Sequence, residues 1–200
     1  MSQCGFCSVN AQYLCVRNDI PLCVTHARLA VIMPSPSQEI HVLSVRPAEA
    51  GDYEGIRQLA EYFWQETEMF CFGRTYDVLA LPALVAFRDQ ALAGCLSYSI
   101  EGSELVIVML NVLPEHQRSG LGGKLVSWVV DLAKAKNLSR VVVATSNDDL
   151  PAIYFYQRRG FRLSQVAADA IARHHGGLEP GFAGIPVRDE VRMTLELGPS

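Results

Sequence analysis

The chain has 200 residues, of which 50% are hydrophobic and 19% are charged, so it can bury a core and is not a disordered chain. Its formal charge of −4 gives no support for non-specific nucleic-acid binding. No apolar run approaches the roughly 20 residues that span a bilayer, and no secretory signal opens the chain. We therefore expect a cytoplasmic protein without a membrane partner and without a nucleic-acid partner.

Composition divides the chain near residue 40. The first 33 residues are rich in cysteine, and the stretch MPSPSQE that follows combines two prolines with polar residues, as linkers do. The rest of the chain has the length of one ordinary domain. The sequence thus predicts a small module at 1–33, a linker at 34–40 and a larger domain at 41–200.

Hydrophobic periodicity predicts the elements of the larger domain in chain order. They are a strand at 41–46, a helix at 49–65, strands at 82–87, 91–100 and 104–113, a helix at 120–137, a strand at 141–144, a helix at 151–159, a strand from 161 and a last strand at 191–197. Residues 66–80 are ambiguous, and 166–173 look helical. This order predicts a mixed α/β fold, in which an antiparallel meander precedes a strand–loop–helix–strand unit.

The most informative stretch is LNVLPEHQRSGLGGKL, residues 110–125, where a strand ends and a helix begins among glycines. Gln117, Gly120 and Gly122 form the pattern Q-x-x-G-x-G. A helix N-terminus offers unpaired N–H groups and a positive dipole end, and glycine lets the backbone approach an anion closely. The pattern therefore predicts a pyrophosphate cradle, the alternative being a glycine-containing turn. It matches neither a dinucleotide fingerprint nor a Walker loop.

A second motif, DLPAIYFYQRRGF at 149–161, follows in the chain. In order and spacing, the two motifs resemble those of the GNAT superfamily of N-acetyltransferases, over about residues 41–197. The resemblance implies an α/β fold with a mixed sheet that binds acyl-CoA. It also implies transfer of an acetyl group from acetyl-CoA to a primary amine of a small molecule, peptide or protein.

The resemblance assigns acetyl-CoA to two backbone segments. Pantetheine would pair with the strand backbone, and an N–H near its end would polarise the thioester carbonyl; the matching residues are Leu110, Asn111 and Val112. The pyrophosphate would lie on the loop formed by Gln117, Arg118, Ser119, Gly120, Leu121, Gly122 and Gly123. Asp149 stands where the family usually has asparagine, and Asn147 lies two residues earlier, so either could touch the cofactor. We assign Asp149 to the cofactor site, although a carboxylate would repel phosphate.

Two side chains are candidates for proton transfer. Tyr156 matches the tyrosine that protonates the departing thiolate in many family members, the alternative being a packed aromatic side chain. Glu104 is the candidate general base, with a solvent-facing turn residue or a water relay as alternatives. We interpret His174 and His175 as residues near a helix C-terminus, where histidine favours the helix dipole.

Four ligands for a metal occur in the first module. Cys4-x-x-Cys7 and Cys23-x-x-His26 are two half-sites that together satisfy tetrahedral Zn²⁺. A strand predicted at 12–16 would bring them together, and structural zinc would stabilise a module too small to fold alone. Cys15 is interpreted as a core residue of that strand, although it could replace His26. Redox-active cysteines are the alternative for the whole cluster.

Two other functions stay open from the sequence. One is a non-catalytic acyl-CoA sensor, which would bind acetyl-CoA without turnover. In the other, the main function lies in the zinc module, which would dock onto a protein or nucleic acid. A homodimer and a protein partner of the module also stay open. The isolated Cys71 and Cys95 are expected in the core, because they lie in apolar surroundings.

The two half-sites predict about one zinc ion per chain, by the four-ligand rule for structural zinc. Metal analysis of protein purified without added zinc checks this. Cys23→Ser should release the metal because it removes a ligand, whereas Cys15→Ser should retain it. A folded, reduced sample that holds iron or no metal would contradict the assignment.

Overall fold

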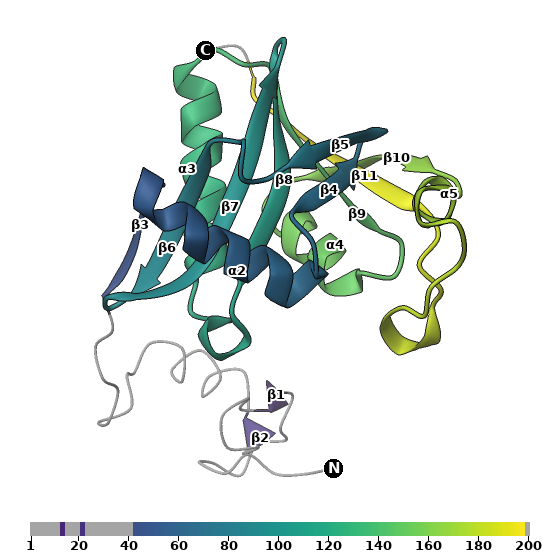
Figure 1. Cartoon of the computed structure of the whole chain (residues 1–200), viewed down its shortest axis with the longest axis horizontal. Helices are drawn as coiled ribbons and strands as arrows, with labels where there is room; N and C mark the ends of the chain where they lie inside the picture. Colours follow the sequence, from purple (N-terminus) through teal and green to yellow (C-terminus); the bar gives the residue numbers. More distant parts are fainter. Residues whose placement is uncertain (1–12, 15–20, 23–41, 199–200) are drawn as a thin grey trace. The chain divides into compact units, whose positions relative to one another are not determined.

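The computed structural model describes residues 13–14, 21–22 and 42–198 (Figure 1). The chain divides into two units, Met1–His41 and Val42–Ser200. In the first unit, β1 (Tyr13–Leu14) pairs antiparallel with β2 (Pro21–Leu22), and β1 falls inside the strand expected at 12–16. The predicted ligands Cys4, Cys7, Cys23 and His26, like Cys15, lie outside the described residues.

A seven-stranded sheet forms the centre of the second unit, in the order β10-β11-β9-β8-β7-β6-β3 (Figure 1). Its neighbouring strands are antiparallel except for β8 and β9, which are parallel. Its members are β3 (Leu43–Pro47), β6 (Ala83–Arg88), β7 (Ala91–Glu101), β8 (Glu104–Val112), β9 (Arg140–Ser146), β10 (Arg162–Ala167) and β11 (Glu190–Glu196).

Helices cover both faces of this sheet. One face carries α2 (Tyr53–Trp64), and the other carries α3 (Leu121–Ala135) and α4 (Leu150–Gln157). The remaining described elements are the hairpin of β4 (Glu68–Cys71) and β5 (Arg74–Asp77), the short helix α5 (Ala170–His175) and the 3-10 turns η1 (Ala50–Asp52), η2 (Pro114–His116) and η3 (Phe182–Gly184).

The core follows from strand alternation, because successive side chains point to opposite faces. In β6, Leu84 and Ala86 pack in the cluster beneath α3 and α4, whereas Ala83 and Val85 pack beneath α2. Cys95 is buried in the second cluster, as expected, and burial raises the pKa of its thiol to about 12. A buried thiol with a raised pKa stays protonated at neutral pH and is therefore unreactive, so Cys95 contributes to core packing.

The two parallel strands separate halfway along the sheet. β8 pairs with β9 from Glu104–Ile107 onto Arg140–Val143, and the pairing stops there. Beyond that point β8 continues to Val112 along β7, and β9 continues to Ser146 along β11. Among the described residues, the edge of β8 that faces β9 therefore has no strand partner from Val108 onward, and the sheet opens at its centre.

The expected mixed α/β fold and its antiparallel meander are confirmed. Two segments differ from the expectation. The ambiguous residues 66–80 form the β4–β5 hairpin, and 166–173 begin as the end of β10 before α5 starts at Ala170. Pairing with β11 extends β10 to Ala167, because a strand already in the sheet gains ladder hydrogen bonds that outweigh weak helical periodicity.

Candidate functional site

A cavity of about 370 Å³ lies where β8 ends and α3 begins. We call it the Gly120 cavity. Most of the residues assigned to acetyl-CoA from the sequence line it, and so does Tyr156. Its lining residues are Leu110, Val112, His116, Gln117, Arg118, Gly120, Leu121, Gly122, Gly123, Pro151, Ala152, Phe155, Tyr156 and Arg159. The structure thus brings the two sequence motifs together at one site.

Gly120 is the N-cap of α3, and its conformation requires glycine. Its φ is +96°, a left-handed value that L side chains rarely adopt. No heavy atom lies within 4 Å of the position a Cβ would take, so the space above the helix N-terminus is open. An anion could approach the first N–H groups of α3 through that space.

Five residues that line the Gly120 cavity had no role assigned from the sequence, and two of them, Arg159 and His116, carry nitrogen groups that could meet a ligand. Arg159 lies with its guanidinium carbon 3.6 Å from the centroid of the Phe155 ring, and its Nη1 donates to the Phe155 carbonyl at 2.8 Å. A Cβ on Gly123 would come within 2.9 Å of Arg159 Nη2, which places this cation over the start of α3. His116 also lines the cavity, and its Nδ1 is buried with no partner among the described residues. The sequence signal that could have identified Arg159 is the basic pair Arg158-Arg159, which directly precedes Gly160 in the second motif.

These groups fit an anionic ligand. Arg118 and Arg159 supply positive charge, the N-terminus of α3 supplies N–H groups, and His116 supplies an unused buried nitrogen. No acidic side chain occurs among the described residues that line the cavity. Gln117 donates from Nε2 to the Val112 carbonyl at 3.1 Å, so its side chain fastens the loop to the end of β8.

Tyr156 is 5% exposed and lies in the core beneath the cavity. Its ring packs edge-on against Phe155 and Phe161, so the packing alternative accounts for the ring. Among the described residues, none forms a hydrogen bond with its hydroxyl. Burial, followed by the nearby negative charge of Asp149, raises the pKa of Tyr156 well above the usual tyrosine value. The phenol therefore keeps its proton throughout the neutral range, as a proton donor must.

Asn111 is oriented away from the Gly120 cavity. Its side chain is 4% exposed, and its Oδ1 accepts a hydrogen bond from the Trp64 indole at 3.2 Å. Leu110 and Val112, on either side of it in β8, both line the cavity. Any role of Asn111 in holding a ligand therefore belongs to its backbone.

A second cavity, of about 480 Å³, lies in the opening between β8 and β9. We call it the Asp148 cavity. Aromatic residues from the end of α2 and from β4 form one part of it, and carboxylates form another. Its lining residues are Phe63, Trp64, Glu66, Met69, Phe70, Val108, Met109, Leu110, Ala144, Thr145, Ser146, Asp148, Asp149, Ile171, His175, Glu179, Val187 and Glu190. Leu110 lines both cavities, so they meet at this residue of β8.

The two cavities have opposite charge. The Asp148 cavity has five carboxylates and one histidine in its described lining, without Lys or Arg. Glu190 is neutralised, because Arg192 Nη2 lies 2.7 Å from its Oε2. Asp148 is 7% exposed and accepts from the Ser146 hydroxyl and from the Phe182 N–H, and no cation pairs with it among the described residues. The cavity therefore favours a cationic ligand.

The assignment of Asp149 to the acetyl-CoA site is not supported by its position. Asp149 is the N-cap of α4: its Oδ1 accepts from the Ala152 N–H at 3.0 Å and its Oδ2 from the Thr145 hydroxyl at 3.1 Å. It lines the Asp148 cavity and is absent from the lining of the Gly120 cavity. An aspartate caps a helix N-terminus as well as an asparagine does. Helix capping alone therefore explains why aspartate can replace the family's usual asparagine here, and no contact with a ligand is needed.

Glu104 also lies away from the site. It forms an ion pair with Arg140 where β8 and β9 begin their pairing. Leu110 is six residues further along β8, roughly 20 Å at the rise of an extended strand. Glu104 is therefore a structural residue at the far end of the strand, and its assignment as general base is withdrawn.

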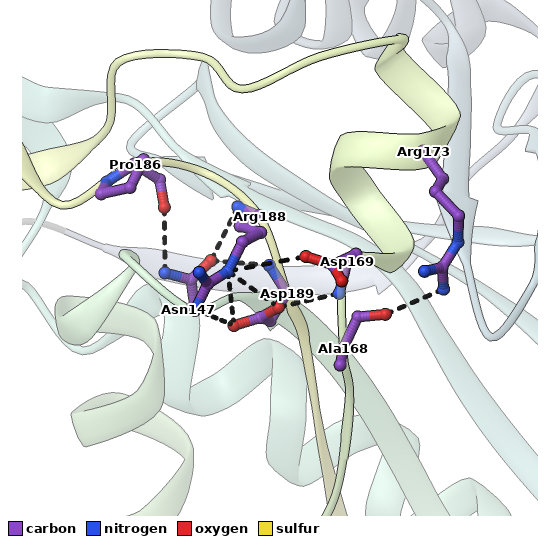
Figure 2. A network of polar contacts seen from close by, with 7 residues as sticks. All are labelled: Asn147, Ala168, Asp169, Arg173, Pro186, Arg188 and Asp189. Carbon is purple, nitrogen blue, oxygen red and sulfur yellow. Dashed lines mark hydrogen bonds and ion pairs between the residues drawn. The ribbon is translucent and has the colours of Figure 1, made fainter.

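The segment between β10 and β11 lines one side of the Asp148 cavity, and Asn147 anchors it (Figure 2). Asn147 Oδ1 accepts from the N–H groups of Arg188 and Asp189, both at 2.8 Å, and its Nδ2 donates to the Pro186 carbonyl at 3.0 Å. Asp189 in turn accepts from the Asp169 N–H at 2.8 Å, next to the start of α5. Asn147 thus serves the fold, because both lone pairs of its Oδ1 and one hydrogen of its Nδ2 are used in holding this segment.

Comparison with known proteins identifies this arrangement. The model of the acetyltransferase (GNAT) family matches residues 40–161. The uncharacterized protein YdhI of Bacillus subtilis is 30% identical over 144 residues, which cover 68% of this chain and 89% of YdhI. No helix in the described residues is long and apolar enough to cross a membrane.

Solved structures share the fold. The IAA acetyltransferase from Bacillus cereus aligns with a TM-score of 0.62 at 20% identity, covering 78% of this chain and 100% of that one. A GNAT family acetyltransferase from Elizabethkingia anophelis with acetyl-CoA bound aligns with a TM-score of 0.60 at 21% identity, covering 78% and 98%. With both motifs placed at one cavity beside the parted strands, the chain belongs to the GNAT family and is an acetyl-CoA-dependent N-acetyltransferase.

Proposed function

We propose that the chain binds acetyl-CoA in the Gly120 cavity and transfers its acetyl group to a primary amine held in the Asp148 cavity. One observation carries this proposal: two cavities of opposite charge meet at Leu110, where β8 has lost its strand partner. The positive cavity suits the phosphates of the donor. The negative one suits an amine, which is an ammonium ion in water at neutral pH.

The donor would be held mainly by backbone groups. The N–H groups at the start of α3 take the pyrophosphate, with Arg118 and Arg159 beside it. Pantetheine adds to the edge of β8 beyond Ile107, which offers backbone groups without a strand partner. This places the thioester near Leu110, at the meeting point of the cavities, where a backbone N–H can stabilise the oxyanion.

Tyr156 is the proposed proton donor to the departing sulfur. It lines the Gly120 cavity, its hydroxyl has no partner among the described residues, and burial keeps it protonated. The amine attacks the thioester carbon, the tetrahedral intermediate collapses, and the thiolate leaves with the phenol proton. The tyrosinate recovers a proton from the amide nitrogen that has just formed its bond, so the phenol is restored.

We propose in addition that the first unit binds structural zinc through Cys4, Cys7, Cys23 and His26. The described hairpin supports this, since Tyr13 pairs with Leu22 and the chain reverses between the two half-sites. Residues 42–198 contain no cluster of three or more potential metal ligands, so the catalytic unit offers no competing site among its described residues. The module could then serve as a docking unit beside the enzyme.

Gly120→Glu should weaken acetyl-CoA binding on the order of 100-fold, because a carboxylate a few ångströms from the pyrophosphate is worth about 3–4 kcal/mol of repulsion near a protein surface. Calorimetry measures the dissociation constant. Gly102→Glu is the matched control, since Gly102 also has positive φ and open space but lies in the β7–β8 turn. Equal affinities of the two variants would show that the cradle is misassigned.

Tyr156→Phe should lower turnover by roughly 100-fold, on the scale of general-acid catalysis, while the acetyl-CoA dissociation constant changes little. The substitution keeps the packed ring and removes the hydroxyl alone. Release of free thiol with an accepted amine measures turnover. Tyr154→Phe is the control, because Tyr154 lies on the same helix, is 66% exposed and does not line the cavity. Full turnover in Tyr156→Phe would return Tyr156 to packing alone.

The charge of the Asp148 cavity predicts which amines are accepted. 2-Phenylethylamine should have a kcat/KM at least about tenfold above that of phenylalanine, which adds a carboxylate near Asp148. A screen that also contains 1,4-diaminobutane and a lysine peptide, followed by thiol release, tests this. Asp148→Asn should reduce the ratio of kcat/KM for 2-phenylethylamine to kcat/KM for phenylalanine. Asp131→Asn, at an exposed position of α3, should leave this ratio unchanged. Equal use of the two matched compounds would remove the acidic cavity as acceptor site, and a sensor would bind acetyl-CoA without turnover on any amine.

A further inference from the structure

His175 is an unassigned titratable side chain at the proposed acceptor site. It is the last residue of α5 and lines the Asp148 cavity. Its Nδ1 lies 3.0 Å from Glu179 Oε1, and its side chain is 32% exposed. This contact occupies one ring nitrogen, and Nε2 has no hydrogen-bond partner among the described residues. A histidine whose Nδ1 faces a carboxylate has Nε2 available to accept a proton.

The His175–Glu179 pair is held in place by contacts from three directions. The neighbouring His174 ring stacks on Phe70 of β4, with 4.1 Å between centroids and 10° between planes. The N–H groups of Ile171 and Ala172 both donate to the Arg188 carbonyl at 3.1 Å, which ties α5 to the anchored segment of Figure 2. The backbone of Glu179 bridges to Val187, whose N–H donates to its carbonyl at 2.9 Å. These contacts fix the backbone that carries both residues, while the Glu179 side chain is 57% exposed.

Three of the five carboxylates in the same cavity accept hydrogen bonds on both oxygens. Glu190 accepts from the Phe72 N–H and from Arg192, and Asp149 caps α4 with both oxygens. Asp148 also accepts hydrogen bonds on both oxygens. An ordinary carboxyl group titrates near pH 4, so it is a weak base at neutral pH, whereas imidazole titrates close to neutrality. Among the described lining residues, His175 has the chemistry that proton removal requires.

We propose that His175, positioned by Glu179, is the general base that deprotonates the acceptor amine. This inference rests on the proposed function, because it requires an ammonium ion in the Asp148 cavity. His175 Nε2 takes one proton from the ammonium, and the neutral amine uses its freed electron pair to attack the thioester carbon. Each turnover converts an ammonium ion and a thioester into an amide, a thiol and one proton, which the imidazolium returns to water.

The charged groups around His175 are mostly carboxylates. They reach the same cavity from the turn after α2, from the β9–α4 turn, from β11 and from the segment after α5, and His174 lies beside it; these groups are Glu66, Asp148, Asp149, Glu190, Glu179 and His174. This negative environment favours binding of the ammonium form of the acceptor. A general base acts only without its proton, so turnover should fall at acidic pH.

The test compares kcat across pH for the wild type and His175→Gln, with acetyl-CoA and the best amine of the screen both saturating. The wild type should reach a plateau near neutral pH. His175→Gln should lose about 100-fold at about pH 7 and rise steadily towards about pH 9, as the bound amine loses its proton to water. Added imidazole should restore part of the turnover of His175→Ala, because it can enter the space of the lost ring.

Two further variants separate catalysis from folding. His174→Phe keeps the stack on Phe70 and should retain both turnover and the plateau. Glu179→Gln should lower kcat by less than His175→Gln does and keep the wild-type plateau, because its amide oxygen can still accept a hydrogen bond from Nδ1. Acetyl-CoA affinity, measured by calorimetry, should be the same in all variants.

A wild-type plateau that persists at full height in His175→Gln would overturn the role of His175 and leave the proposed acetyl transfer intact. Loss of turnover in His175→Gln that follows the wild-type pH profile and resists imidazole would also overturn it, because the residue would then act through structure. A wild type that binds acetyl-CoA but acetylates no amine of the screen would instead reject the proposed function, and this inference with it.

Discussion

The parting of β8 and β9 is the constraint on which the rest of the site depends. Parallel pairing ends at Ile107 and Val143, so within the described part of the chain β8 continues beside β7 alone and β9 beside β11 alone. Exposed backbone groups are costly unless they are hydrogen-bonded, and an extended ligand can satisfy them as a missing strand would. The Asp148 cavity lies in the same opening, and the two cavities meet at Leu110.

Charge is distributed around this opening in a way that separates two reactants. The start of α3, Arg118 and Arg159 make one cavity positive, and the turn after β9 together with the segment before β11 makes the other negative. Opposite fields a short distance apart attract a polyanionic donor and a cationic acceptor to different places, which limits binding in the wrong cavity. The reacting atoms are then brought together by position, which lowers the entropic cost of their encounter.

The segment between β10 and β11 shows how a structural network can prepare a site. Asn147 and Asp189 hold this segment through main-chain contacts, and Glu179 and His175 extend from it into the Asp148 cavity. Asn147 and Asp189 provide the support by accepting hydrogen bonds from backbone N–H groups, whereas the Nε2 of His175 has no hydrogen-bond partner among the described residues. Asn147 and Asp149, whose side chains could bind a ligand, instead accept hydrogen bonds from backbone N–H groups and stabilise the fold.

The sequence by itself determined the strand–loop–helix unit, the glycine at the start of α3 and the place of Tyr156, because these features depend on local periodicity and on short motifs with a backbone purpose. It could not decide the roles of Glu104, Asp149 and His175, since these depend on what surrounds each side chain in space. Tertiary structure paired Glu104 with Arg140, directed Asp149 to the N-terminus of α4, and placed His175 with its sequence neighbour Glu179 in the Asp148 cavity. It also placed Arg159 above α3, because packing α4 against the sheet decides where that cation lies.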